Sequence, residues 1–243
     1  VKTGSGALME TLPDALALAQ TMVDIGKLAG KPVVAVITSM AQPLGTHIGN
    51  ALEVKDAIDV LSGRTQGDLL EISLLLGSHM LVLAEKAKTL PEARAMLENA
   101  LSSGAGLRKL AEMIAAQGGD PRVVEDLSLL PQAAVKRVMR AETAGYLSAM
   151  DTTALGMAAQ RMGAGRAKKS DMLDYSVGYV LHVRLGDEVT EDTPLATLYA
   201  RNEAEAEEAE KAIRKALTIA GEKPSVPPLW DAVVTAEGIT YNR

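Results

Sequence analysis

Residues 38–57, TSMAQPLGTHIGNALEVKDA, are the part of this chain that most restricts its fold. The apolar run at residues 32–37 precedes them and predicts a buried strand. Apolar residues at three- and four-residue spacing follow over residues 52–61 and predict a helix with one buried face. A strand followed by a loop and a helix is the repeating unit of α/β proteins, so we expect a fold of that class.

The loop between the predicted strand and helix contains Pro43, Gly45 and Gly49, which let main-chain groups turn toward a common point. Asn50 is expected to cap the helix, and Asp56 falls within the first two turns. A glycine-containing loop next to an inward-facing acid is typical of a small-ligand or ion site in an α/β protein. The alternative is a tight connection whose glycines serve only packing.

Three segments in collinear order resemble the pyrimidine-nucleoside phosphorylase family, which includes thymidine phosphorylase. They are VKTGSGALM at residues 1–9, PLGTHIGNALEVKDA at residues 43–57 and DYSVGYVLHVRLGDEV at residues 174–189. The resemblance extends from residue 1 to about residue 220 and implies the C-terminal portion of such an enzyme, because family members carry a long N-terminal portion before it.

The composition excludes several classes of partner. The 243 residues carry a formal net charge of −6, lack Phe and contain one Trp and five Tyr, so we expect no nucleic-acid surface built on base stacking. The absence of Cys excludes disulfides and thiolate metal sites and is typical of a cytoplasmic protein. The most apolar stretch, residues 69–84, contains polar residues and is shorter than the roughly 20 residues of a membrane span, so we expect no membrane association.

The predicted elements change in character along the chain. Helices dominate up to residue 130, and we assign residues 1–130 to part of a mixed-sheet α/β domain. Short strands and turns follow, ending in a charged helix at residues 202–220. We assign residues 131–220 to a small α/β-hammerhead, barrel-sandwich-like module of the kind that the resemblance implies. Residues 221–243 are expected to form an extended tail.

A hairpin predicted around residues 184–187 raises a second possibility for this module, because biotin and lipoyl carrier domains share its outline. Those carriers present a lysine at the tip of a hairpin, where its amine is acylated. The turn here reads Arg-Leu-Gly-Asp, without a lysine, which argues against a carrier.

The resemblance implies particular site residues. Leu8 takes the place of an apolar or aromatic wall of the base pocket. Some family members bind a monovalent cation, K⁺, through two loop carbonyls and a helix carboxylate, which correspond to the main-chain oxygens of Leu44 and His47 and to the side chain of Asp56. A weakly hydrated cation is well satisfied by such carbonyl dipoles and one nearby charge. Asp56 stands where the family has Glu, and the alternative is that it is a solvated helix acid.

The activity implied by the resemblance is phosphorolysis, with inorganic phosphate as co-substrate. Phosphate attacks C1′ of a pyrimidine nucleoside and releases the free base and a pentose 1-phosphate, a transferase reaction of pyrimidine salvage. The sequence leaves uridine and thymidine as alternative substrates. We expect no catalytic residue in this portion, no activity of the chain alone, and a homodimer for the full-length enzyme. The alternative is a non-catalytic binding or assembly module that retains the family scaffold.

Overall fold

The computed structural model describes residues 1–242, and these residues form two compact units. The first unit comprises Val1–Ala41, Gln66–Ser103 and the described part of Pro227–Arg243, and the second comprises Gln42–Thr65 and Gly104–Val226. Helices and several sheets occur together, so the predicted mixed α/β class is confirmed. None of the helices within residues 1–242 is long and apolar enough to cross a membrane.

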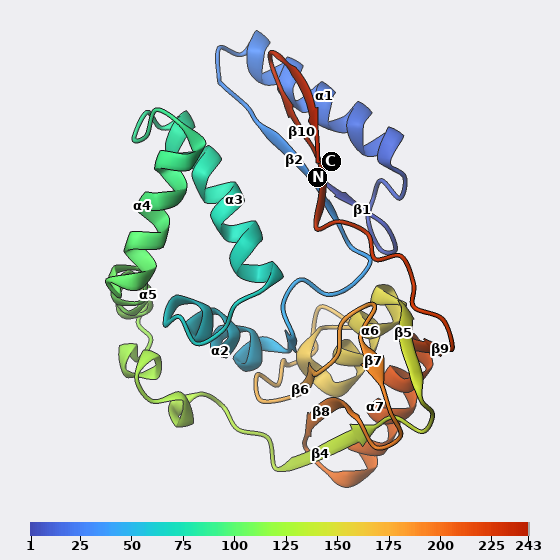
Figure 1. Cartoon of the computed structure of the whole chain (residues 1–243). Helices are drawn as coiled ribbons and strands as arrows, with labels where there is room; N and C mark the ends of the chain where they lie inside the picture. The colour runs from blue at the N-terminus through green and yellow to red at the C-terminus, as the bar shows by residue number, and fades with distance from the viewer. Residues whose placement is uncertain (243) are drawn as a thin grey trace. The chain divides into compact units, whose positions relative to one another are not determined.

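The first unit contains a four-stranded sheet in the order β1-β2-β10-β11, in which β1 runs parallel to β2 and the other neighbours are antiparallel. Its strands are β1 (Lys2–Thr3), β2 (Ala35–Ser39), β10 (Trp230–Thr235) and β11 (Gly238–Tyr241). Helix α1 (Leu12–Leu28) packs along β2 and β10 (Figure 1). Small residues of α1 meet the sheet in a buried cluster formed by Ala15, Ala19, Val23, Ile37, Ala232 and Val234.

The same unit contains a helical hairpin of α3 (Asp68–Leu83) and α4 (Leu90–Ser102). Gly77 lets the two helices approach closely, because a Cβ atom there would lie 2.8 Å from a methyl carbon of Leu97. Arg94 of α4 forms an ion pair with Glu71 of α3 at 3.0 Å. The close approach at Gly77 and the ion pair between Arg94 and Glu71 therefore both favour the pairing of α3 with α4.

The second unit is built around two antiparallel sheets. One has the order β3-β6-β8-β4, from β3 (His47–Ile48), β6 (Gly178–Leu181), β8 (Pro194–Ala200) and β4 (Val135–Arg140). The other has the order β7-β5-β9, from β7 (Glu188–Val189), β5 (Gly145–Met150) and β9 (Leu217–Ala220).

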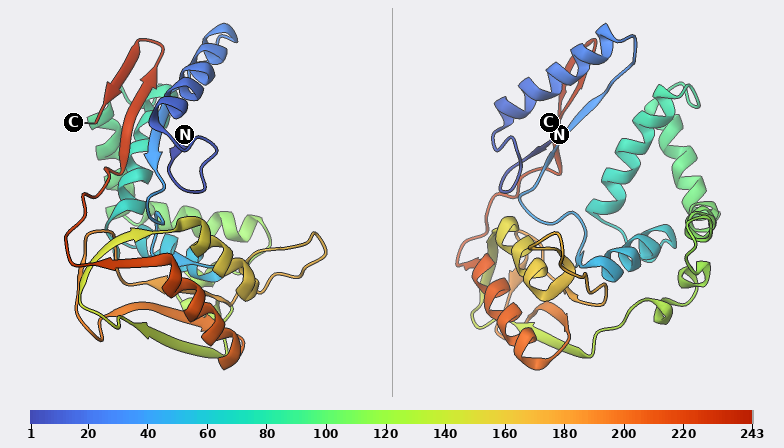
Figure 2. Two further views of the ribbon diagram at one scale, coloured as in Figure 1. Left: turned by 90° about the vertical axis from the view of Figure 1, so that its right-hand side faces the viewer. Right: turned by 180° about the vertical axis from the view of Figure 1, so that it is seen from behind.

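Helices α6 (Thr152–Ala159) and α7 (Glu203–Ala216) pack side by side next to these sheets (Figure 2). The large core between them includes the fully buried side chains of Leu147, Leu155, Tyr179, Leu198 and Ile213. The remaining helical segments of the unit are α2 (Asn50–Leu61), α5 (Ala105–Ala116), η1 (Pro121–Val124), η2 (Leu127–Leu129) and the π-turn η3 (Gln160–Ala164).

Strand β3 is the feature of this unit that matters for the site. It is only two residues long, and it extends the sheet of β6, β8 and β4 with the register His47↔Val180 and Ile48↔Tyr179. Helix α2 begins directly after it, so the loop and helix on which the sequence analysis centred are held by the edge of this sheet.

Three local predictions are wrong. The helix predicted for residues 202–220 ends at Ala216, because residues 217–220 pair with β5 as strand β9. The turn at residues 184–187 does not close a hairpin, because β6 and β7 lie in different sheets. Asn50 is the first residue of α2 rather than its cap; the cap is Gly49, and the side-chain amide nitrogen of Asn50 donates to the carbonyl of Ala164 at 2.8 Å.

The domain division predicted at residues 130 and 220 stays a prediction. In the structure, residues 42–65 belong to the same compact unit as residues 104–226. The predicted extended tail contains β10 and β11.

Candidate functional site

The loop at residues 42–49 reaches its position because two glycines meet where it crosses β6. Gly49 has φ +132° and Gly178 has φ +148°, conformations that side chains of L-residues rarely adopt. A Cβ atom on Gly49 would lie 3.0 Å from the Cα atom of Gly178, and one on Gly178 would lie 2.9 Å from the Cα atom of Gly49. This close contact holds the start of α2 against β6.

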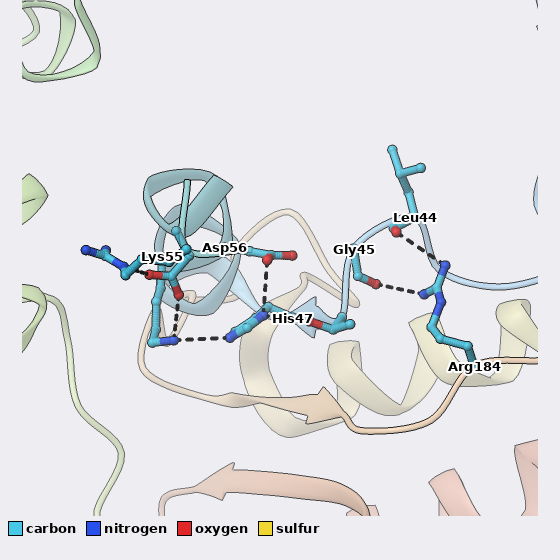
Figure 3. A network of polar contacts seen from close by, with 9 residues as sticks. Leu44, Gly45, His47, Lys55, Asp56 and Arg184 are labelled. Atoms are coloured by element: carbon cyan, nitrogen blue, oxygen red, sulfur yellow. Dashed lines mark hydrogen bonds and ion pairs between the residues drawn. The ribbon is translucent and has the colours of Figure 1, made fainter. Parts of the chain in front are cut away.

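Asp56 lies on the buried face of α2 and is only 4% exposed. Its carboxylate lies 3.4 Å from Nδ1 of His47 in the preceding strand (Figure 3). The alternative that Asp56 is a solvated helix acid is therefore wrong. A buried carboxylate can accept several hydrogen bonds and is costly to leave poorly compensated.

The His47 ring bridges Asp56 and Lys55. Its Nε2 atom lies 3.4 Å from the ammonium nitrogen of Lys55, and its Nδ1 atom lies 3.0 Å from the hydroxyl oxygen of Thr46 and 3.4 Å from the Asp56 carboxylate. Burial lowers the pKa of His47, the Asp56 carboxylate opposes this effect, and the neighbouring ammonium group of Lys55 adds to it. The net effect is a pKa below the ordinary value of 6.5 for His47.

Asp59 continues this network one turn along α2. It accepts from Lys55 at 2.9 Å and from Nε of Arg64 at 2.8 Å. Burial raises the pKa of Asp59, but the hydrogen bonds from Lys55 and Arg64 outweigh this effect and lower it. Lys55 therefore links the carboxylate of Asp59 to the ring of His47, which in turn contacts Asp56.

The carbonyls of the loop divide into two groups. Those of Leu44 and Gly45 accept from the guanidinium group of Arg184 at 3.4 and 3.5 Å (Figure 3), and that of Pro43 accepts from the same group at 2.6 Å. The amide of Leu181 donates to the carbonyl of Thr46 at 2.8 Å.

His47 occupies the next register position along β3. In an antiparallel ladder, hydrogen-bonded and non-hydrogen-bonded pairs alternate, so the main-chain carbonyl of His47 points away from β6. This carbonyl is turned outward at the edge of the sheet.

Among the groups predicted to form the cation site, the Asp56 carboxylate contacts the ring of His47 rather than its predicted main-chain oxygen, and the carbonyl of Leu44 faces Arg184. Arg184 is predicted from the sequence only as part of a turn, and it carries no local signal for this contact because its acceptors are about 140 positions earlier in the chain. Among residues 1–242 there is no cluster of three or more His, Cys, Asp or Glu side chains arranged to hold a metal ion.

Leu8 belongs to the first unit and lies in the loop after β1. Its side chain is 94% exposed, which is unusual for a large apolar residue and leaves it available for contact. Its role as a wall of a base pocket stays a prediction.

Two family models match the chain in succession. Residues 1–107 match the model described as "Glycosyl transferase family, a/b domain", and residues 146–220 match the model described as "Pyrimidine nucleoside phosphorylase C-terminal domain". The candidate loop and α2 lie within the first match, and Arg184 lies within the second.

Curated proteins from several bacteria are similar over most of the chain. A pyrimidine-nucleoside phosphorylase of Geobacillus stearothermophilus is 50% identical over 203 residues, which cover 84% of this chain and 47% of that protein. One from Bacillus subtilis (strain 168) shows the same identity and coverage. One from Staphylococcus aureus (strain USA300) is 45% identical over 235 residues, covering 97% of this chain and 54% of that protein. The chain therefore spans about half the length of these relatives.

Proposed function

The chain belongs to the family of pyrimidine-nucleoside phosphorylases, and from this premise we propose that it forms part of an enzyme that splits a pyrimidine nucleoside with inorganic phosphate. The observation that carries the proposal is the collinear match of two family models together with 45–50% identity to curated relatives. Phosphate attacks C1′ of the nucleoside, the bond to the base breaks, and the products are the free base and a pentose 1-phosphate.

The reaction requires no nucleophile from the protein, because phosphate itself attacks C1′. The enzyme holds phosphate and nucleoside in line and stabilises the negative charge that grows on the leaving base while the sugar becomes oxocarbenium-like. The resemblance implies base-binding Arg, Ser and Lys residues that have no match in this sequence, and the chain spans about half of its relatives' length. We therefore expect the chain to be inactive alone and to contribute Leu8 to the wall of the base pocket.

The proposal extends to a monovalent cation, K⁺, between the loop and α2. Two of the three predicted donors suit it: Asp56 is a buried carboxylate beside the His47 ring, and the main-chain carbonyl of His47 points outward. The carbonyl of Leu44 is shared with Arg184. A cation held there would neutralise Asp56 and link it to the main chain of β3, which is a structural contribution.

Three further features are proposed from family membership. Residues 131–220 form a hammerhead-like, barrel-sandwich module, and their two antiparallel sheets with α6 and α7 support this assignment. The full-length enzyme acts as a homodimer. It works in the cytoplasm, in pyrimidine salvage.

A chimaeric enzyme tests the proposal directly. Residues 1–243 would replace the matching segment of the Geobacillus stearothermophilus relative, and release of uracil or thymine would be followed with and without phosphate. We expect phosphate-dependent release from both uridine and thymidine or from one of them, and none from the chain alone. A folded chimaera without phosphorolysis would contradict the proposal and favour the non-catalytic module, and release by the isolated chain would contradict its predicted inactivity.

The cation is tested separately in the same chimaera. Asp56→Asn should abolish any difference in thermal stability between potassium chloride and choline chloride, because it removes the charged member of the three predicted donors. Asp59→Asn is the matched control, since it removes a neighbouring carboxylate of α2 whose partners are Lys55 and Arg64. Equal K⁺ responses of the native protein and Asp56→Asn would contradict this part of the proposal.

A further inference from the structure

Three consecutive loop carbonyls converge on one side chain of the second unit. Nη1 of Arg184 donates to the carbonyl of Pro43 at 2.6 Å. It also donates to that of Gly45 at 3.5 Å, and Nη2 donates to that of Leu44 at 3.4 Å (Figure 3). Successive carbonyls of an extended chain point to opposite sides, so this convergence requires the loop to be folded around the guanidinium group.

The backbone that carries Arg184 is itself fixed. The amide of Arg184 donates to the carboxylate of Asp187 at 2.7 Å, and the amide of Leu185 donates to the side-chain carbonyl of Gln42 at 2.9 Å. The preceding residue, Val183, is buried in the core. The guanidinium group is therefore placed by the turn at residues 184–187 before it meets the loop.

The chemistry of the two partners matches. Converging carbonyl dipoles create a region of negative potential that a cation satisfies, as in the carbonyl rings that bind weakly hydrated metal ions. A guanidinium group stays charged at all relevant pH values and offers five donors in a fixed plane, so it can serve several carbonyls at once. A free cation sharing the Leu44 carbonyl would lie close to this group and be repelled by it.

We propose that Arg184 is a positioning residue whose guanidinium group supplies, in covalently attached form, the positive charge that the carbonyls of residues 43–45 require. The loop is therefore ordered without an added monovalent cation, and only the carbonyl of His47 and the carboxylate of Asp56 remain for one. This inference deepens the proposed function, and only the assignment of the two remaining donors rests on the cation proposed there.

Hydrogen exchange of two amides reports directly on the loop. The amide of Leu181 donates to the carbonyl of Thr46, and the amide of Leu185 donates to the side chain of Gln42. Exchange would be followed by NMR on the full chain in choline chloride and in potassium chloride, with amides of α7 as internal reference. In the native chain we expect equal protection of both amides in the two salts.

Arg184→Ala should speed exchange of the Leu181 and Leu185 amides at least about tenfold in choline chloride, because hydrogen bonds from a charged donor each contribute about that factor or more. Millimolar methylguanidinium should restore protection, and Arg184→Lys should retain part of it because lysine keeps the charge but lacks the planar fork. Arg201→Ala is the matched control: it removes an arginine of the same unit that pairs with Glu205 on the exposed start of α7. It should leave both amides unchanged.

The outcomes separate this inference from the proposed function. Native-like exchange in Arg184→Ala, or native protection that needs K⁺, would overturn the role of Arg184. Slower exchange in Arg184→Lys than in Arg184→Ala, together with rescue by methylguanidinium, supports it. An inactive chimaera, or one without a K⁺ response, would remove the proposed function and leave the role of Arg184 in ordering the loop intact.

Discussion

Replacing Gly178 by alanine should destabilise the second unit by about 2–6 kcal/mol. Gly178 has φ +148°, where a non-glycine residue costs about 1–3 kcal/mol. The new Cβ atom would lie 2.9 Å from the Cα atom of Gly49 and closer still to the carbonyl oxygen of Ile48, both of them backbone atoms that cannot move as side chains do. Overpacking of this kind costs a further about 1–3 kcal/mol. The same displacement would separate β3 from β6 and release the start of α2.

Urea unfolding followed by circular dichroism measures this loss, and two other glycines of the unit separate its causes. Gly63 has φ +72°, and no atom lies within 4 Å of the point that a Cβ atom would occupy there, so Gly63→Ala carries conformational strain alone and should cost about 1 kcal/mol. Gly156 lies inside α6 with the same open space, so Gly156→Ala should stabilise by about 0.5–1 kcal/mol. A loss in Gly178→Ala no greater than that in Gly63→Ala would refute the argument from close backbone contact.

Two further predictions concern buried polar groups of the same unit. Tyr179→Phe should lower the free energy of unfolding by about 1–2 kcal/mol with an unchanged urea slope, because the buried hydroxyl donates to the carbonyl of Leu155 at 2.8 Å. Asp59→Asn should lower stability near pH 7, and the difference from the native chain should shrink as pH falls. The folded pKa of Asp59 is lowered by Lys55 and Arg64, so its contribution is present above its ordinary value of 3.8 and is lost as pH falls through the folded pKa. Urea midpoints at about pH 7 and about pH 3 measure this difference, and a gap that widens toward acid pH would contradict it.

The helices could largely be predicted because their signals are local. Helix α1, Leu12–Leu28, is an example, because its start is fixed by a Thr11 cap and a proline in the first turn. The error at residues 217–220 has the opposite cause. Residues 217–220 are uncharged and include the β-branched residues Thr218 and Ile219, which favour a strand, but the segment follows the charged helix without a break. Pairing with β5, about 70 residues earlier in the chain, makes it a strand.

The candidate site likewise has features with a local sequence signal and features that depend on long-range contacts. A helix acid near a glycine-containing loop could be predicted from residues 43–57, and Asp56 is indeed buried on α2. The contact of Arg184 with the loop could not be predicted, because it depends on β3 joining β6 and thereby bringing the turn at residues 184–187 beside it. The cap at Gly49 was missed because Asn50, a residue common at caps, stands next to it, while the contact with Gly178 selects glycine.

The two-residue strand β3 has a consequence for how this protein can be divided. By sequence it lies in the match to the first family model, residues 1–107, yet its ladder partners lie in residues 146–220. A truncation or exchange made in the region between the two matches would leave the edge of β6 unpaired in one product. In the other product, β3 and the helix that carries Asp56 would lack the sheet against which they pack. Recombination between relatives that keeps residues 42–65 and 146–220 from one parent should therefore give folded products more often than recombination that cuts between the two family models.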